Sequence, residues 1–519
     1  MKKRIVIINP KFEASYWGLE YAMPLLGKRA NLPTACLPLL AALTPPEFDV
    51  ELVDENVEEL DFQRLASADI VALTGMSVQR HRMREILGEF RQRGSFLVVG
   101  GPWATVREDY FGELVDVVFV GEAEVTWPQF LSDWISGTHV QRYEQAHKTD
   151  MTTVPTPRLD MLDTRQYAFG SLQISRGCPF QCEFCDIIVT FGRRPRLKSV
   201  SQVIHELDAM RRAKLQIAFI VDDNLIGNKS AIKPILREIA SWQGEHGFPF
   251  SFFAEASLDL ADDDEMIALL IQCNVQAVFV GIETTNLAAL RETKKFQNLR
   301  GGGTLLEKVE RIQKQGLEVW SGMMLGFDSD TPEVFSAQVE FVSSARIIHA
   351  MCGMLSAIPK TPLYERLKAE NRLNPGDELT YGTNVVPKQM TQEQLYAGYK
   401  EVMLELSSAD NYFDRVDSLF LDPEFVFNQS QRQYWQRHPL QRLSYEVRMW
   451  VICLVLKRRI LSRIEDSHLQ KKYRKQLRQA WRRRPDISVY FVYLLKCAIH
   501  FHYTQFNSRH LQGSVVNTF

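Results

Sequence analysis

The sequence has few cysteines, almost no net charge and no long apolar run, and each absence excludes a class of protein. Eight cysteines in 519 residues are too sparse for a disulfide-stapled scaffold. A net charge of −2, from 61 Lys and Arg against 63 Asp and Glu, argues against a general nucleic-acid binder, which would be basic throughout. No apolar stretch reaches about 18 residues, so no membrane-spanning helix is expected.

Length and the first residues set the remaining expectations. At about 150 residues per domain, the length predicts roughly three compact units. The opening run MKKRIVIINP predicts a first β-strand, because its apolar part is too short for a signal peptide. The expected compartment is the cytoplasm, where thiols stay reduced.

Short β-branched runs alternate with helical patterns over the first 140 or so residues. Strands that alternate with helices predict a parallel, doubly wound sheet. The predicted strands are residues 4–8, 49–53, 70–73, 96–99 and 117–120. Ligands of such sheets bind beyond the carboxyl ends of the strands, where glycine lets a backbone approach closely. The alternative is that the residues after these strands form ordinary strand-to-helix turns.

A second strand-and-helix series begins near residue 171, after a polar linker that contains Pro155 and Pro157. Its predicted strands are residues 172–175, 217–221, 250–254, 277–280, 318–324 and 353–358. About six strand-helix units suggest a partial barrel, whose chemistry would lie at the C-terminal mouth. Beyond about residue 380 the strand signal fades and helical patterns follow.

Three cysteines, Cys178, Cys182 and Cys185, fall within eight residues directly after a predicted strand. Thiolates spaced four and three residues apart on one loop can reach three corners of an iron–sulfur cube, which leaves the fourth corner without a protein ligand. Zinc is the alternative, but a zinc site normally has a fourth Cys or His close by. The other five are interpreted as small buried hydrophobes; they are Cys36, Cys273, Cys352, Cys453 and Cys497.

The CxxxCxxC pattern, with Phe184 before the last cysteine and a barrel strand before the loop, resembles the radical S-adenosylmethionine (SAM) enzymes. The resemblance implies a [4Fe–4S] cluster on the three cysteines, with SAM chelating the open iron. An electron from the cluster would cleave SAM to a 5′-deoxyadenosyl radical, which abstracts a substrate hydrogen. The cofactors would carry this chemistry, and the protein would supply placement.

Segments at the ends of later strands agree with the same family and are implied to contact SAM. The residues are Asp222, Asp223, Glu255, Gly281, Glu283 and Gly326. Each has a structural alternative: Asp223 would cap a helix, and Glu255 or Glu283 would pair with an arginine.

The N-terminal region resembles the Rossmann-like cobalamin-binding domain of class B radical SAM methyltransferases. Many such domains ligate cobalt through an Asp-x-His-x-x-Gly loop, but here Asn56 stands where His would be and Glu59 where Gly would be. A histidine-ligated cobalt at this loop is therefore not expected. The other residues that the resemblance implies for cobalamin are Ser77, Gln79, Gly100, Gly101, Gly121 and Glu122.

Together the resemblances predict three domains and one linker. The domains are a cobalamin-binding domain at residues 1–145, a radical SAM partial (β/α)6 barrel at 171–375 and a mostly helical region at 376–519, and the linker is at 146–170. The runs around Val221–Lys229 and Gly326–Asp330 resemble the subgroup that contains the hopanoid C-2 methylase. The implied reaction transfers a methyl group from methylcobalamin to an unactivated carbon of a hydrophobic polycyclic or isoprenoid substrate, such as a hopanoid. The alternatives are a cyclase or oxidoreductase acting on a tetrapyrrole or natural product, and a non-enzymatic cobalamin or redox sensor.

The C-terminal region is strongly basic: between Arg432 and Arg484, sixteen Lys and Arg face three acidic residues. Short apolar stretches beside basic clusters suit a helix that lies on an anionic membrane. The alternative is a helical cap on the barrel with a solvated basic face. No recognised RNA-binding motif accompanies the charge, so no nucleic-acid partner is expected. The remaining expected partner is a reducing electron donor such as flavodoxin or ferredoxin.

Overall fold

The structure, a computed structural model, describes residues 2–374, 376, 379 and 381–510. It contains two compact units. The first consists of the residues up to Glu13, Leu32–Ile235 and Ile358–Glu365, and the second of Ala14–Asn31, Leu236–Ala357 and the chain from Arg366 on. The division at Leu236 falls inside helix α9 (Lys229–Glu245). These units differ from the predicted domains, whose boundaries remain a prediction.

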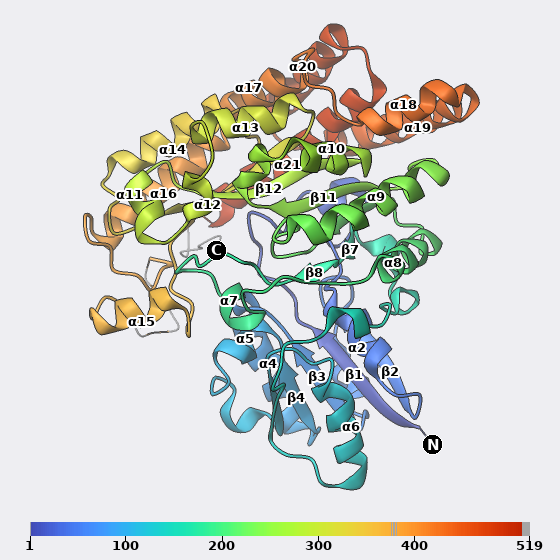
Figure 1. Ribbon diagram of the computed structural model, residues 1–519, viewed down its shortest axis with the longest axis vertical. Helices are drawn as coiled ribbons and strands as arrows, with labels where there is room; N and C mark the ends of the chain where they lie inside the picture. Colours follow the sequence, from blue (N-terminus) through green and yellow to red (C-terminus); the bar gives the residue numbers. More distant parts are fainter. Residues whose placement is uncertain (1, 375, 377–378, 380, 511–519) are drawn as a thin grey trace. The chain divides into compact units, whose positions relative to one another are not determined.

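The first unit contains a parallel six-stranded sheet in the order β2-β1-β3-β4-β5-β6 (Figure 1). Five of its strands lie within a few residues of the predicted ones. The strands are β1 (Lys3–Asn9), β2 (Phe48–Asp54), β3 (Ile70–Thr74), β4 (Leu97–Gly100), β5 (Val117–Val120) and β6 (Arg142–Glu144). Strand β6 was not predicted, because three residues with no apolar run carry no strand signal.

Helices cover both faces of this sheet. In β1, Ile5 and Ile7 belong to one buried core and Val6 and Ile8 to another, because successive side chains of a strand point to opposite faces. The first core is completed by α2 (Cys36–Leu43) and α6 (Thr126–Ser136), the second by α4 (Arg80–Gln92) and α5 (Pro102–Val106). The shorter helices are α3 (Phe62–Leu65), η1 (Ser77–Gln79) and η2 (Gly112–Leu114).

The predicted strand at residues 172–175 is broken in two. Strand β7 (Gly170–Leu172) pairs in parallel with β10 (Ile217–Ile220), whereas β8 (Ser175–Arg176) pairs antiparallel with β9 (Arg196–Leu197). The break arises because the Asp222 carboxylate accepts hydrogen bonds from the backbone N–H of Ile174 and of Ser175, both at 2.7 Å. Nearby helices are η3 (Met151–Thr153), η4 (Leu159–Met161), η5 (Thr164–Gln166), α7 (Ile187–Thr190) and α8 (Val200–Arg212).

The second unit contains four parallel strands in the order β14-β13-β12-β11. They are β11 (Ser251–Ala256), β12 (Val275–Glu283), β13 (Glu318–Leu325) and β14 (Ala350–Met354). The last strand lies earlier than the predicted residues 353–358, because its partner β13 ends at Leu325, opposite Met354. Associated helices are η6 (Leu258–Asp262), α10 (Asp264–Gln272), α11 (Leu287–Glu292), α12 (Phe296–Leu299), α13 (Leu305–Lys314) and α14 (Glu333–Ser344). The division between the units at Arg366 falls inside α15 (Pro362–Ala369).

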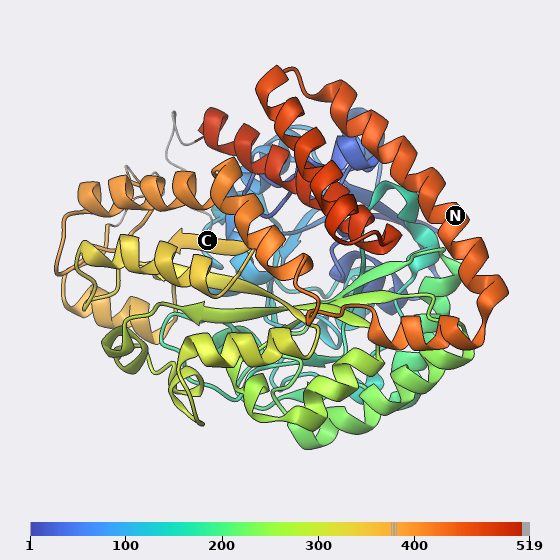
Figure 2. The ribbon, with the colours of Figure 1, turned by 90° about the horizontal axis from the view of Figure 1, so that it is seen from above.

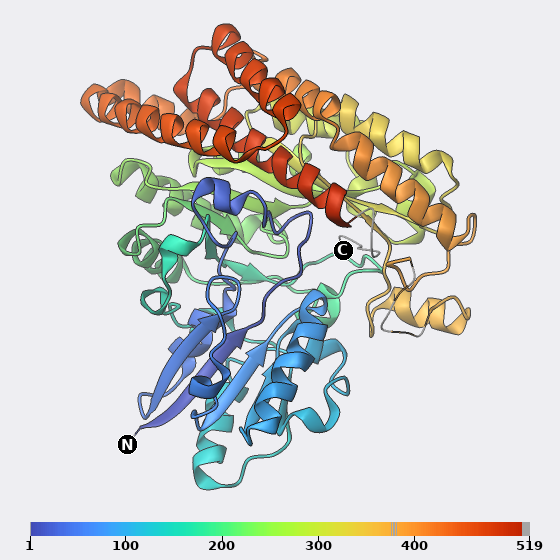
Figure 3. The same cartoon turned by 180° about the vertical axis from the view of Figure 1, so that it is seen from behind.

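The C-terminal part of the second unit is helical, as predicted (Figures 2 and 3). Its helices are α16 (Gln392–Leu406), α17 (Ala409–Phe420), α18 (Gln429–Arg437), α19 (Pro439–Arg463), α20 (Ser467–Arg483) and α21 (Ile487–His510). Residues 14–31, which include α1 (Met23–Leu26), pack against this part of the chain. Tyr16 stacks on Tyr503 of α21 with ring centres 3.9 Å apart, and the Tyr21 N–H donates to the His502 ring.

Candidate active site

The three clustered cysteines lie in the loop between β8 and α7, in the first unit. Gly177, just before Cys178, has φ +92°, and a Cβ there would lie 2.9 Å from the Arg194 carbonyl oxygen. Only glycine tolerates both conditions. The Cys178 N–H donates to the Gly192 carbonyl at 3.3 Å, and the Cys185 N–H to the Cys182 carbonyl at 3.2 Å. The loop is therefore fixed at both ends of the cysteine motif.

The donor set of this loop fits a [4Fe–4S] cluster. Cys182 is buried, while Cys178 and Cys185 are half-buried, as is Phe184. Burial, the nearby Asp186 and the other two thiols raise the pKa of Cys185. The Asn224 side-chain amide donates to the Cys178 sulfur at 3.8 Å. Each thiolate of such a cluster binds its own iron, and among the described residues no three His, Cys, Asp or Glu side chains converge on one metal ion.

Two buried aspartates that follow β10 hold the backbone before the cysteines. Asp223 accepts from the Gly177 N–H at 2.7 Å. Asp222 accepts hydrogen bonds from the backbone N–H groups of Ile174 and Ser175, as described above. It also accepts one from the Ser175 hydroxyl at 2.6 Å. Burial raises the pKa of Asp222 to about 7 and that of Asp223 to about 6. Both predicted SAM residues thus have backbone partners, and neither caps a helix.

A buried ion-pair network joins the same loop to the end of β5. The Arg176 guanidinium contacts Glu122 at 2.9 Å and Glu124 at 2.6 Å, and Arg196 contacts Glu122 at 3.0 Å. The second Glu122 oxygen accepts from the Thr149 N–H at 2.9 Å. Glu122 was predicted to lie near cobalamin. The two arginines were missed, because Arg196 lies outside the motif and nothing in the motif links Arg176 to a glutamate 54 residues earlier.

The loop after β2, where a cobalt ligand was considered, is a closed polar cluster. The Asn56 amide donates to Asp54 at 2.6 Å, and its oxygen accepts from the Phe12 N–H at 2.9 Å. Gln79 is buried; its amide donates to Asn9 at 3.0 Å, and its oxygen accepts from the Met76 N–H at 2.9 Å. Asp54 also accepts from the Asn9 amide at 3.0 Å and from the Tyr167 hydroxyl at 2.8 Å. Both ends of the Asn56 amide are bonded within the protein.

The predicted turns at the carboxyl edge of the same sheet differ in how much space they leave. Gly101 has φ +93°, and a Cβ there would lie 2.7 Å from the Thr74 hydroxyl. Gly121 has φ +83° but no heavy atom within 4 Å of such a Cβ. Gly100 packs against Phe119, and Ser77 begins η1. The open space is therefore at Gly121.

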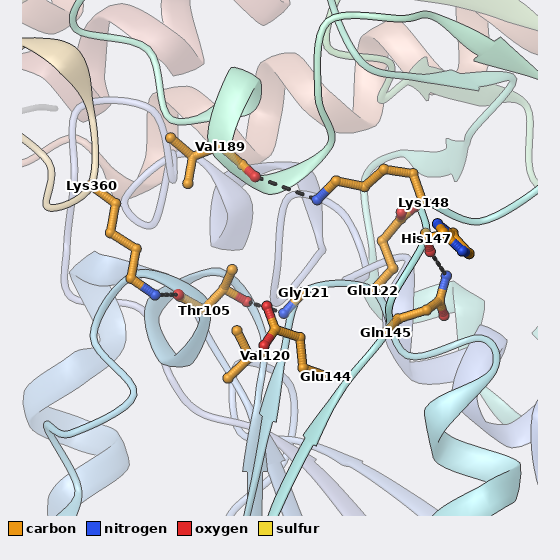
Figure 4. A pocket seen from close by; sticks show the side chains of 10 residues that line it. All are labelled: Thr105, Val120, Gly121, Glu122, Glu144, Gln145, His147, Lys148, Val189 and Lys360. Atoms are coloured by element: carbon orange, nitrogen blue, oxygen red, sulfur yellow. Dashed lines mark hydrogen bonds between the residues drawn. The ribbon is translucent and has the colours of Figure 1, made fainter.

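A cavity of about 160 Å³ opens at this position, at the carboxyl end of β5 (Figure 4). Lys360 and Lys148 flank it: the Lys360 amine donates to the Thr105 carbonyl at 2.7 Å, and Lys148 to the Val189 carbonyl at 3.4 Å. The residues around the cavity are Thr105, Val120, Gly121, Glu122, Glu144, Gln145, His147, Lys148, Val189 and Lys360. Ligands of doubly wound sheets bind at this edge.

The remaining predicted residues belong to the second unit. Glu283 is buried and has φ +69°, at a point where the pairing of β12 with β13 shifts register. Its carboxylate pairs with the Lys295 amine at 2.5 Å, where the sequence alternative was an arginine. Strained backbone at a bulge is common at functional sites. A Cβ at Gly281 would lie 2.3 Å from the Glu283 carboxylate.

Gly326 and Glu255 complete this set. Gly326 has φ +101° and donates its N–H to the buried Asp330 carboxylate at 3.0 Å. Glu255 is half-buried on β11. Its alternate neighbour Phe253 shares its face of the sheet.

Comparison with known proteins shows the class of this chain. The Radical SAM superfamily matches residues 172–342, and a domain of unknown function, DUF4070, matches residues 361–514. An uncharacterized methyltransferase of Synechocystis sp. is 39% identical over 424 residues, which are 80% of this chain and 78% of that protein. The chain is a radical SAM methyltransferase. Within that class it belongs to the group of the hopanoid C-2 methylase of Rhodopseudomonas palustris, to which it is 33% identical over 421 residues, 80% of this chain and 79% of that one.

Solved structures show the same fold. TsrM from Kitasatospora setae, described with cobalamin and a [4Fe–4S] cluster bound, has a TM-score of 0.59 at 17% identity and covers 77% of this chain and 81% of its own. OxsB, described with aqua-cobalamin and SAM bound, has a TM-score of 0.59 at 14% identity and covers 98% of this chain and 80% of its own. The predicted family, fold class and enzyme class are confirmed. The predicted cofactors are those that these two descriptions name.

Proposed function

We propose that this protein is a cobalamin-dependent radical SAM C-methyltransferase that acts on a hydrophobic polycyclic or isoprenoid substrate such as a hopanoid. The observation that carries the proposal is the loop from Gly177 to Cys185, in which three neighbouring thiols follow a backbone held by buried carboxylates. The relation to the hopanoid C-2 methylase supports the substrate class.

The chain's own residues would place the cofactors. When bound, the cluster, SAM and cobalamin supply an adenosyl radical and a transferable methyl group. Cys178, Cys182 and Cys185 would hold the cluster, and Asp223 would keep Gly177 in the conformation that presents Cys178. The carboxyl edge of the N-terminal sheet, with its cavity beside Gly121, would receive part of cobalamin.

Aromatic side chains on β11, β12 and β13 support an apolar substrate. Phe253 stacks on Trp320 with ring centres 4.9 Å apart, and Trp17 meets Phe279 edge-on at 5.6 Å. Phe253 and Phe279 lie two positions before Glu255 and Gly281 in their strands and so share their face. The indole N–H groups of Trp17 and Trp320 are buried without a hydrogen-bond partner in the part of the chain that the structure describes. A flat apolar ring system with one polar group would match this surface.

The chemistry requires a reductant, for which flavodoxin or ferredoxin is the expected class. Among the described residues no helix is long and apolar enough to cross a membrane. A peripheral membrane contact is proposed for α19 and is argued below.

Lipid analysis of a producing strain tests the substrate class. A strain that lacks this protein should lose a methylated polycyclic lipid. The native gene should restore the lipid, and the Cys182→Ala gene should not. Unchanged lipids in the strain that lacks the protein would overturn the lipid proposal and would direct the search to tetrapyrroles and other natural products.

A further inference from the structure

We propose that helix α19 docks this protein on an anionic membrane surface through an apolar face that the folded chain leaves exposed. Helix α19 is apolar on two opposite sides. On one side Met449, Cys453, Leu456 and Ile460 are buried, and the helix packs there against α21. The other side remains in contact with solvent.

Five residues form the exposed face, here called the α19 stripe. Their exposed fractions lie between 57% and 82%. The five are Leu440, Leu443, Val447, Val451 and Leu454. With 3.6 residues per turn, this spacing places all five within an arc of about 80°. A continuous apolar row of this kind on a water-exposed helix marks a contact surface, whereas single exposed apolar residues do not.

The charges around the stripe indicate what kind of surface it binds. Helix α19 carries six basic residues and one acidic residue, Glu446, and α20 carries seven basic residues and no acidic one. Glu446 is already paired with Arg442 at 2.7 Å. Arg448 and Arg458 are exposed beside the stripe and at its end. Long basic side chains can lie along apolar surface while their charges reach phosphate groups.

A membrane fits these observations better than a second copy of the chain. A symmetric contact through the stripe would bring the basic residues of two α19 helices together, and like charges oppose such pairing. On a membrane, the lipid acyl chains would contact the apolar row, and the anionic headgroups would pair with the arginines. Trp450, at the edge of the stripe, packs edge-on against Trp481 with ring centres 5.0 Å apart, and tryptophan favours the headgroup region. Figures 2 and 3 show α19 as a long helix at the outer side of the C-terminal helices.

Sedimentation of the full-length protein with vesicles tests the proposal. We expect binding to phosphatidylcholine vesicles that contain phosphatidylglycerol, and about tenfold weaker binding to phosphatidylcholine alone or at high salt. The triple variant Leu443→Ser, Val447→Ser, Val451→Ser should bind about tenfold more weakly. The variant Arg448→Glu, Arg458→Glu should lose the preference for anionic vesicles.

The matched control is Ile135→Ser with Leu404→Ser, which removes exposed apolar side chains from other helices and should bind like the native protein. Native protein that stays in the supernatant at low salt would overturn the proposal, as would equal binding by the triple variant with its circular dichroism unchanged. A dimer in solution that the triple variant abolishes would assign the stripe to a second copy and would equally overturn it. Docking needs no methyl transfer, so its failure and the failure of the proposed function are distinguishable.

Discussion

Two loops of the first unit, one after β2 and one after β8, were both expected to contact a cofactor, and only the second was expected to ligate a metal. Around Asn56 the polar side chains bond to one another, so the loop is complete by itself. In the cysteine loop a buried carboxylate holds the backbone just before the three thiols. Under the proposed function, the first loop would form a surface beside which a cofactor lies, and the second would supply the ligands of the cluster.

The charges that support the two loops differ in the same way. The cysteine loop depends on the buried network of Arg176, Arg196, Glu122 and Glu124. Such a network costs desolvation and stabilises only when every charge is paired. The loop after β2 depends on hydrogen bonds among amides, backbone N–H groups and the single carboxylate of Asp54. Those between neutral groups contribute about 1 kcal/mol each, and those to the carboxylate about 1.5–3 kcal/mol. Substitutions in the cysteine loop should therefore have the larger effects.

The largest effect is expected at the cysteines. Cys182→Ala should bind far less iron after reconstitution and lower methyl transfer by about 10³-fold or more, because the reaction depends on the cluster. Iron content and the visible absorption of the cluster measure the first effect. Cys273→Ala, which removes a buried cysteine elsewhere, is the control and should retain full iron. Equal iron content in both variants would show that this loop does not bind the cluster.

Breaking the ion-pair network should have the next largest effect. Glu122→Gln leaves the half-buried Arg196 without its carboxylate and should lower the free energy of unfolding by about 3 kcal/mol. Urea unfolding measures it. The control Glu144→Gln breaks an exposed pair with Arg142 and should cost less than about 1 kcal/mol. A loss at Glu122 as small as that of the control would show that the network does not support the loop.

The loop after β2 should respond more weakly. Gln79→Ala leaves the Met76 N–H and the Asn9 oxygen without that partner and should lower the free energy of unfolding by about 1–3 kcal/mol. Ser77→Ala, at the half-buried start of η1, should change it by less than about 0.5 kcal/mol. With cobalamin bound, we expect Gln79→Ala and Ser77→Ala to give the same cobalt electron paramagnetic resonance spectrum as each other. If Gln79→Ala lowered the free energy of unfolding more than Glu122→Gln does, the expectation that the cysteine loop responds more strongly would be wrong.

A separate effect, on pH dependence, is expected at Asp222. Burial raises its pKa in the folded protein to about 7, above the ordinary value of 3.8. Its contribution to stability is therefore fully present below about pH 4 and is lost as the pH rises through 7. Asp222→Asn should remove this contribution to the fall in the free energy of unfolding between about pH 4 and pH 7, as measured by urea unfolding at several pH values. Identical pH profiles for the native protein and the variant would contradict the assignment.

The sequence predicted the features that local patterns encode. The β-branched runs gave five strands of the N-terminal sheet, and the cysteine spacing singled out the loop that follows β8. The boundaries of β8 were missed, because the side chain that breaks the strand, Asp222, lies about 50 residues later. The partners of Arg176 and the packing of Trp17 against Phe279 were missed for the same reason.

The basic C-terminal region shows what else a one-dimensional pattern leaves open. The sequence located apolar residues among arginines, and both a membrane helix and a solvated cap fitted them. The side of α19 that packs against α21 depends on tertiary contacts. Only the folded chain separates Cys453, which is buried, from Leu454, which is exposed.

The most direct test of the central claim is label transfer from SAM. The reconstituted protein, with cobalamin and a low-potential reductant, is incubated with SAM that carries a deuterated methyl group and with a hopanoid. Mass spectrometry should find a product in which one CD₃ group replaces a hydrogen, together with 5′-deoxyadenosine in equal amount. Formation of 5′-deoxyadenosine that depends on the substrate, with no label in the product, would contradict the account and would identify a radical enzyme that oxidises or closes a ring.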